Sequence, residues 1–353
     1  MEAEEQLAGW QAVATLYHRF FTGLLLSVVS RRGAADAGAF TEALFRRQHQ
    51  AKFLPGIAKL GLAEEPDAVK AAGYHYLANR IGGVKVEFMR ESDRKAWVHF
   101  VPPRWIYDGV AICGIPSEVS RGVLRGWYAR NGVSLGNSRL GFVCTSQTAD
   151  GQAGLTGYFR EYDVPLEPAD RLRFAPGEMA PRFDPAAAPV LDGAAWTPLR
   201  LAKANRTYAM DYIRTGLPIL AELFGPADAA HLARTTGRLV GMQYYDEIAG
   251  QLGGVAPGAA GFAAMVARLA AGQDDECTIE SLGETARVRQ TTWRLMRGVA
   301  GLPDSVFDGW HGLLEGLLAV HDRFLRLENR GRRDRGDAAF VWDVLPRLPS
   351  PVF

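Results

Sequence analysis

The first half of the chain shows a regular succession of hydrophobic patterns. Apolar residues at helical spacing give way to alternating apolar and polar residues, and the same change occurs again before residue 165. Helical spacing predicts amphipathic helices, and alternation on both sides of a polar turn predicts a β-hairpin. The predicted order is helix, helix, hairpin, helix, hairpin, over residues 39–59, 67–82, 86–100, 116–132 and 139–164.

A similar succession occurs in the second half. GIPSEVSRGVLRG at 114–126 resembles GLPDSVFDGWHGLLEG at 301–316, since both place Gly, an aliphatic residue and Pro before a helical pattern. The second half is predicted to form a helix over 304–321 and a closing hairpin over 324–345. Four more pairs of segments match in the same order: 53–61 with 216–225, 72–83 with 231–241, 86–100 with 277–290, and 162–164 with 342–344. Matches that keep one order along the chain indicate two copies of one unit.

These patterns predict an α+β fold in which two tandem repeats form an intramolecular pseudo-dimer. The helical segment 1–38 has no evident copy and is predicted to cap the assembly. The first repeat is expected over 39–164 and the second over 201–346. Between them, 165–200 holds seven of the 19 prolines. Because proline removes a backbone donor and fixes φ, this segment is predicted to be an extended connector without regular elements.

Composition narrows the range of partners and compartments. The 353 residues exceed the size of one ordinary core, and 40 basic side chains balance 39 acidic ones, so neither nucleic acid nor a membrane surface is an expected partner. The densest basic run, 330–335, is interrupted by acidic residues and is interpreted as a solvated turn. Three isolated cysteines fit a reducing cytoplasm. The apolar run 20–29 follows an acidic start and is too short to span a bilayer, so a buried helix is expected.

The closing part of each half resembles a known family. The resemblance rests on WHGLLEGLLAVHDRFLRLENRGRRDRGDAAFVWDV at 310–344 and, less clearly, on 120–163. These residues resemble the vinyl-reductase-type ligand-binding domains and, more closely, the L-2-amino-thiazoline-4-carboxylic acid hydrolase-like proteins. Such domains commonly carry Gly-Asp-x-x-Cys near their end, where this chain has Gly336-Asp337 followed by Ala338-Ala339-Phe340. The resemblance implies a small-molecule domain in each half and hydrolysis of a C–N or C–S bond in a heterocyclic or amide-like compound.

A comparison of the two halves selects polar residues that occur only in the first. In the alignment above, His75 stands opposite Ala233. His49 and His75 each lie 13 residues from Leu62, where two antiparallel helices would join, so both imidazoles are expected at one height. Asn79 follows one turn later on the same face. Either the histidines are hydrogen-bonded within close helix packing, or they line a ligand site in which His75 acts as a base.

The same two histidines raise a metal-binding alternative. Imidazole nitrogens and a carboxylate are common ligands of transition metals, and Glu42 lies two turns before His49 on the same predicted helix. No cofactor is predicted, and the sequence leaves open whether His49 and His75 hold a metal.

The first predicted hairpin offers a second group of candidates. Alternation places Lys95, Trp97 and His99 on one face. A pair between Glu91 and Lys95 across the turn is the simple explanation of both charges, and Glu91 is also a catalytic candidate. Arg90 or Lys95 would bind an anionic group of the substrate, and Trp97 would line its site. His99 is either a hydrogen-bonded core histidine or a general base, for which the ordinary pKa of histidine, near neutrality, is suitable.

Three further residues are candidates of lower rank. Cys113 precedes a predicted helix start, where the pKa of a thiol can fall enough to make it a nucleophile, although its apolar neighbours indicate burial. Cys144 lies in an alternating strand, where it either fills the core or faces a cavity. Tyr158 is a candidate for polar lining of the same cavity.

The expected function is therefore an enzyme of small-molecule metabolism, most simply a hydrolase, with its site in the first half. His99 or His75 would be the base, and Cys113 the alternative nucleophile. Aromatic residues make up 10% of the chain and suit a small aromatic or heterocyclic ligand. A non-catalytic binding or sensor module and a metalloenzyme stay open as alternatives, as does assembly into a homodimer.

Overall fold

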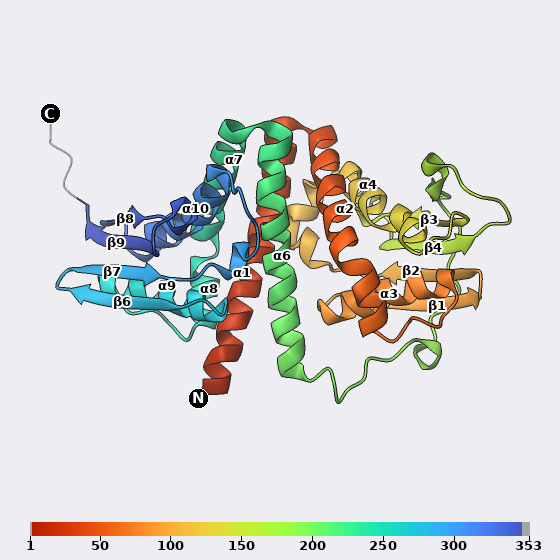
Figure 1. Cartoon of the computed structure of the whole chain (residues 1–353), viewed down its shortest axis with the longest axis horizontal. Coiled ribbons are helices and arrows are strands. Elements are labelled where there is room, and N and C mark those ends of the chain that lie inside the picture. The colour runs from red at the N-terminus through yellow and green to blue at the C-terminus, as the bar shows by residue number, and fades with distance from the viewer. Residues whose placement is uncertain (1, 348–353) are drawn as a thin grey trace. The chain divides into compact units, whose positions relative to one another are not determined.

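The chain folds into helices and two separate β-sheets (Figure 1). The computed structural model describes residues 2–347. The predicted α+β class is confirmed. Contacts divide the chain into two compact units. The first unit is Leu25–Asn205, and the second unit joins the residues up to Leu24 with those from Arg206 onward.

The first unit begins within helix α1 (Glu2–Arg32), which ends at Gly33. Gly33 has a φ of 96°, a conformation that glycine adopts without strain, and α2 starts directly after it. The helix boundary thus lies at residue 33 and not at the predicted residue 38. The unit continues with α2 (Ala34–Lys59), α3 (Asp67–Ile81), β1 (Val86–Ser92), β2 (Lys95–Phe100), α4 (Ser117–Gly126), α5 (Asn131–Ser134), β3 (Leu140–Ser146), β4 (Leu155–Glu161) and β5 (Leu172–Phe174).

The sheet of the first unit has the order β1-β2-β4-β3-β5. Alternation along β2 gives its two faces different partners, as the sequence predicts. Val98 joins Phe142 of β3 and Phe159 of β4 in the core that packs against Leu77 of α3. The opposite face carries a smaller apolar cluster, consisting of Met89, Trp97, Val143 and Tyr158.

The proline-rich connector contains more structure than the sequence predicts. Its residues 172–174 form β5, which pairs with β3 in parallel, and Pro168–Arg171 form the 3-10 helix η5. Ala175, Ala180 and Phe183 then pack on the smaller apolar cluster. A connector expected to run free is therefore held on the sheet, because it covers apolar side chains that would otherwise face water.

The helix predicted over 116–132 is interrupted. Pro116 occupies the N-cap position, and no side chain caps this end. The helix ends at Gly126, and the 3-10 helix η3 (Tyr128–Arg130) leads into α5. The interruption brings Tyr128 and Asn131 against His75 of α3.

The second unit follows the connector along the chain. It contains α7 (Pro226–Gln243), α8 (Tyr245–Gln251), α9 (Gly258–Gly272), β6 (Cys277–Leu282), β7 (Thr285–Gln290), α10 (Asp304–His321), β8 (Leu325–Gly331) and β9 (Phe340–Pro346), together with most of α6 (Pro198–Phe224). Its sheet has the order β6-β7-β9-β8. The predicted helix over 304–321 and the hairpins of both halves are confirmed.

Two matched pairs of segments join helices with different places in the fold. The sequence alignment sets 53–61, at the end of α2, against 216–225, at the end of α6. It also sets 72–83, now α3, against 231–241, which lies in α7. The helix directly before the first hairpin of the second unit is α9, which packs on β6 and β7 as α3 packs on β1 and β2. Comparing His75 with Ala233 therefore compares helices in different positions. The helix α9 has neither histidine nor asparagine, so a comparison of α3 with α9 still finds these polar residues only in the first unit.

A close helix pair occurs in each unit, and glycines permit it. In the first unit, a Cβ on Gly126 of α4 would lie 2.5 Å from the carbonyl oxygen of Glu42 in α2. In the second, a Cβ on Gly312 of α10 would lie 2.6 Å from the carbonyl oxygen of Arg234 in α7. Real Cβ atoms do not approach oxygen so closely, so these backbones can pack only without side chains at these positions.

Helix α1 is longer than its most apolar run. Among the described helices, it is the one with the length and apolar content to cross a membrane, although 61% of the relevant window is buried in the structure. Core helices of soluble proteins pass the same test. The run 20–29, which is too short to span a bilayer by itself, lies within this longer helix. The predicted cytoplasmic location stays a prediction.

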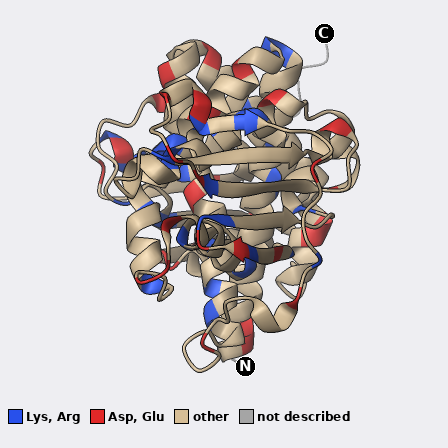
Figure 2. Ribbon diagram, turned by 90° about the vertical axis from the view of Figure 1, so that its right-hand side faces the viewer, with Lys and Arg blue, Asp and Glu red and all other residues tan. Residues whose placement is uncertain are grey.

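Charged residues are mixed in sign over the part of the surface seen in Figure 2. Lys and Arg lie among Asp and Glu, and the strands at the centre of the view are mostly uncharged. This distribution agrees with the small net charge of +1.

Candidate functional site

Two predicted histidines lie together inside the first unit. His49 of α2 is 1% exposed and His75 of α3 is 3% exposed. Both rings contact the indole of Trp127, with centroids 5.7 Å and 6.3 Å away. The Nδ2 of Asn131 hydrogen-bonds to Nε2 of His75 at 3.0 Å. We call His49, His75, Trp127 and Asn131 the two-histidine cluster.

Aromatic rings enclose this cluster. The imidazole of His75 stacks on Tyr128, with centroids 3.9 Å apart and an interplanar angle of 13°, and faces Phe159 at 5.4 Å. His49 stacks on Phe53 at 4.9 Å. Stacked, water-poor surroundings favour flat groups and penalise charge.

Three polar atoms of the two-histidine cluster lack well-formed hydrogen bonds. Nε2 of His49, Nε1 of Trp127 and Oδ1 of Asn131 are buried and make no hydrogen bond of normal geometry within the described range 2–347, although the side chain of Asn131 lies close enough to His49 to oppose the lowering of its pKa. Leaving one such group unpaired costs about 1–3 kcal/mol. Three at one place therefore indicate that something else, a small molecule or water, completes their hydrogen bonds.

Both imidazoles are neutral at physiological pH. Burial, with a contribution from the nearby Arg130, lowers the pKa of His49 to about 4. Burial, followed by the proximity of His49, lowers the pKa of His75 well below its ordinary value. Neutral imidazoles offer one donor and one acceptor each, so the cluster suits recognition of an uncharged polar group better than proton abstraction at neutral pH.

The other residues predicted near these histidines have different roles. The Nδ2 of Asn79 donates to the carbonyl oxygen of His75 at 2.8 Å, so this amide is used within α3. Glu42 accepts a hydrogen bond from Nε of Arg125 at 2.7 Å. Residues 2–347 contain no group of three or more His, Cys, Asp or Glu side chains arranged to hold a metal ion. The His49–His75 metal site thus gains no third ligand in this part of the chain.

The hairpin candidates gather on the outer face of the sheet. Nζ of Lys95 lies 3.1 Å from Glu91, as predicted, and 3.2 Å from Glu178 of the connector. The same ammonium lies over the rings of Tyr158 and Trp97, at 4.3 Å and 4.9 Å from their centroids. Each of these charges already has partners, so Lys95 is not free to bind an anionic substrate group.

Hydrogen bonds tune two acids in this group. Burial alone would raise the pKa of Glu91, but hydrogen bonds from Trp97 and Lys95 outweigh it and lower this pKa. Burial, together with its hydrogen bond to Glu178, raises the pKa of Tyr158 to about 12. The geometry explains both residues as parts of an ion-pair and aromatic group that holds the connector to the sheet.

Arg90 lies apart from this group. It bonds to Asp93 at 2.6 Å and to Glu65 at 3.1 Å. The hydrogen bond that Arg90 donates to Asp93 raises the pKa of Arg90 above its ordinary value. Because two carboxylates already neutralise it, Arg90 does not fit the predicted role of binding an anion.

His99 lies at the far end of the same face, in a hydroxyl chain. Its Nδ1 is 2.8 Å from Oγ1 of Thr156, which lies 2.8 Å from Oγ of Ser146. Gly154, with a φ of 115°, packs directly on the imidazole, where a Cβ would come within 2.6 Å of Cε1. The ring is thus fixed in orientation and half-buried, so the predicted role as a base remains chemically open.

The two cysteines occupy opposite environments. Cys113 is exposed, contrary to the burial expected from its neighbours, because the 3-10 helix Gly109–Cys113 lies at the surface. Cys144 is buried in the helix-facing core, and burial raises the pKa of its thiol to about 12. Such a thiol is protonated at neutral pH, and its place in the core gives it a packing role.

Sequence comparison missed a buried histidine in the second unit. His311 of α10 accepts a hydrogen bond from Nε1 of Trp342 at 3.2 Å, and its Nε2 lies 3.6 Å from Glu315. Glu315 in turn binds Arg234 through two hydrogen bonds. Burial lowers the pKa of His311 to about 4, despite the nearby carboxylate. Unlike the two-histidine cluster, this group has partners on both sides.

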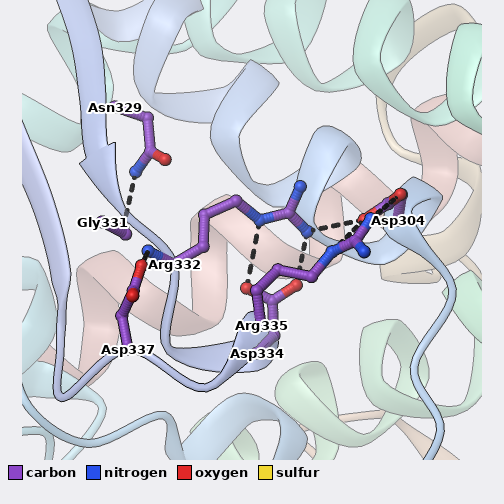
Figure 3. Close-up of polar contacts among 7 residues, drawn as sticks. All are labelled: Asp304, Asn329, Gly331, Arg332, Asp334, Arg335 and Asp337. Carbon is purple, nitrogen blue, oxygen red and sulfur yellow. Dashed lines mark hydrogen bonds and ion pairs between the residues drawn. The ribbon is translucent and has the colours of Figure 1, made fainter.

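The basic run at 330–335 is held by carboxylates. Figure 3 shows Arg332 and Arg335 directed at Asp304, at 3.0 Å and 2.9 Å. The backbone N–H of Arg332 also donates to Asp337 at 2.6 Å. Asp334 pairs with Arg332 as well. The run is a neutralised turn, in line with the sequence-based interpretation that it is not a phosphate site.

The second unit contains a small internal cavity of about 20 Å³, next to Tyr17, Gln273 and Trp310. The hydroxyl of Tyr17 donates to Oε1 of Gln273 at 2.7 Å. A space of this size holds about one water molecule. It therefore offers no room for an organic ligand.

Three residues of the first unit were not functional candidates in the sequence analysis: Arg130, Asn131 and Arg171. Arg130 and Asn131 fall at the end of a predicted helix, so the pattern gave them no functional role, whereas Trp127 was among the aromatic residues expected to suit a ligand. The sequence WYARNG at 127–132, which interrupts that helix, was the available signal.

Comparison with known proteins found no significant match to the chain among protein-family profiles, curated proteins or solved structures.

Proposed function

We propose that the first unit binds a small, flat, uncharged polar group in the two-histidine cluster. The observation that carries this proposal is the set of three unpartnered buried polar atoms inside an aromatic enclosure. A ligand that accepts from the indole N–H and hydrogen-bonds with His49 and Asn131 would satisfy all three. Aromatic stacking next to them would select a planar body.

The test uses Trp127→Phe, which keeps an aromatic ring and removes one donor. Losing a neutral hydrogen bond should weaken binding about tenfold. The first probes are nicotinamide and benzimidazole, which are planar and carry both donor and acceptor atoms. Their dissociation constants are measured by calorimetry, beside Trp196→Phe as the control, because Trp196 lies on the connector against Lys59 and Arg200. Equal affinity in both variants, or no binding to the wild-type protein, would contradict the proposal.

A second candidate function is hydrolysis of a C–N or C–S bond, as the family resemblance implies. The observation that favours it is His99, whose ring is oriented by Thr156. His99 would take a proton from an attacking water through Nε2 while Nδ1 stays bonded to the hydroxyl.

Thr156→Val tests this second function, because it removes the hydroxyl and keeps the side-chain shape. Activity on a small cyclic amide should fall about tenfold to a hundredfold in kcat, with KM little changed. Thr285→Val, which alters a hydroxyl that bonds only to the carbonyl of Leu282, is the control. If wild-type protein shows no turnover while the probes above bind, the binding function stands and the hydrolase is rejected.

The predicted tandem repeats and pseudo-dimer are also part of this proposal. We infer that the chain consists of two tandem repeats, each starting with a long helix, α1 or α6. Two observations support this. The orders β1-β2-β4-β3 and β6-β7-β9-β8 are the same when the strands of each sheet are counted along the chain. Gly225 joins α6 to α7 with a φ of 83°, which is close to the φ of Gly33 between α1 and α2. Under this proposal the repeats form a pseudo-dimer in which the first carries the ligand site.

A further inference from the structure

Two arginines flank the beginning of strand β3. Arg130 is the last residue of η3, and Arg171 is the last residue of η5. Gly132, two residues after Arg130, packs on Leu140, since a Cβ would lie 2.6 Å from the Leu140 carbonyl oxygen. Gly141 packs on the backbone of Arg171, whose carbonyl oxygen would lie 3.4 Å from a Cβ. The two arginines therefore start from neighbouring points on one strand.

Both guanidinium groups are incompletely satisfied. Nε of Arg130 and Nε of Arg171 are buried and make no hydrogen bond with the described residues. Arg46 of α2 is close enough to Arg130 to act on it electrostatically, as is Arg171. Burial first, and then these two positive neighbours, lower the pKa of Arg130, while Glu42 opposes the effect. Glu42, however, is already bonded to Arg125.

Two other arginines at this edge of the sheet form ion pairs. Arg139 pairs with Glu161 at 2.5 Å, and Arg173 pairs with Asp170 at 3.2 Å. Arg46, Arg130 and Arg171 form no ion pair in the range 2–347. Neighbouring guanidinium groups whose one nearby carboxylate, Glu42, is already bonded to Arg125 repel one another, so such an arrangement is stabilised when an anion enters.

We propose that Arg46, Arg130 and Arg171 form a binding site for a phosphate-type dianion, either free phosphate or the phosphate group of a small molecule. The three arginines carry three positive charges, and the one carboxylate near them, Glu42, is already bonded to Arg125. A phosphate group, with about two negative charges at neutral pH, matches this excess of positive charge. The planar donors of arginine suit the oxygens of a tetrahedral oxyanion. This site is separate from the ligand site proposed above, although Arg130 lies near His49.

The test measures phosphate binding by isothermal titration calorimetry at constant ionic strength. Arg171→Gln and Arg130→Gln should each weaken binding tenfold or more, since hydrogen bonds to charged groups are the strong ones. Arg171→Lys keeps the charge but not the two-pronged geometry, and should fall between Arg171→Gln and wild type. Arg173→Gln and Arg139→Gln, at paired arginines of the same edge, should stay within about twofold of wild type.

Three outcomes would overturn the proposal: no phosphate binding to the folded wild-type protein, equal loss in the Arg171 and Arg173 variants, or full binding in Arg171→Gln. Phenyl phosphate separates the two sources of the anion. Tighter binding than inorganic phosphate assigns the site to a phosphate ester, and equal or weaker binding assigns it to the free ion. His49→Leu should leave phosphate binding unchanged, so failure of the two-histidine proposal is distinguishable from failure of this one.

Discussion

Lowering the pH from about 6.5 to 4 should unfold this protein. Burial holds the pKa of His18, His49 and His311 at about 4, and holds that of His75 well below the ordinary value of 6.5. In the unfolded chain each of these imidazoles regains its ordinary affinity for a proton. Between pH 6.5 and 4 the unfolded state therefore binds more protons than the folded state, and stability falls as the pH falls.

The size of this effect is comparable with total stability. For a histidine whose pKa is about 4 when folded and 6.5 when unfolded, the loss at about pH 4.5 is roughly 2.5 kcal/mol. Three such residues and His75 together approach the 5–15 kcal/mol that stabilises an ordinary protein. Carboxylates with lowered pKa values, such as Asp343, add to the loss only at still lower pH.

His49→Phe is the variant that isolates one contribution. Phenylalanine keeps the stacking on Phe53, and it removes Nε2 of His49, which makes no hydrogen bond of normal geometry among the described residues. Urea unfolding at about pH 7 and pH 4.5 should show a drop in free energy that is smaller than in wild type by roughly 2.5 kcal/mol. His231→Gln, at an exposed histidine of α7, is the control and should leave the drop unchanged. An equal drop in His49→Phe and wild type would contradict the assignment.

The helices and hairpins were predictable because their patterns are local. His49 and His75 could be paired from the sequence because equal distances from Leu62 fix the height of residues in antiparallel helices. Their partner Asn131 lies 56 residues beyond His75 and follows an interruption of a helix that periodicity does not reveal. Only the folded chain brings it to the imidazole.

Charge was the least predictable property of individual side chains. Arg90 and Lys95 looked suited to an anion, yet nearby carboxylates already neutralise both. Arg130 and Arg171 attracted no notice, although neither forms an ion pair in the described structure and the Nε of each is buried without a hydrogen bond. A charged residue's availability depends on partners brought by distant segments, here Glu178 of the connector beside Lys95 and Glu65, between α2 and α3, beside Arg90. Similarly, the apolar neighbours of Cys113 suggested burial, but its short 3-10 helix lies at the surface.

Replacing Gly312 by alanine should strongly destabilise the second unit. The added methyl would lie 2.6 Å from the carbonyl oxygen of Arg234, and 3.1 Å and 3.2 Å from its Cα and carbonyl carbon. All three atoms belong to the backbone of α7, so no side chain can rotate away and the two helices must separate. Overpacking of this kind costs about 1–3 kcal/mol, with backbone contacts at the upper end.

A glycine in the same unit supplies the control. Gly250 of α8 is exposed, and a Cβ there would have no atom within 4 Å. Gly250→Ala should therefore stabilise the protein by about 0.5–1 kcal/mol, because alanine loses less backbone entropy in a helix. Opposite shifts of the urea midpoint in the two variants would show that packing, and not helix propensity, sets the requirement at 312. A stabilised Gly312→Ala variant would mean that α7 and α10 are farther apart than the structure has them.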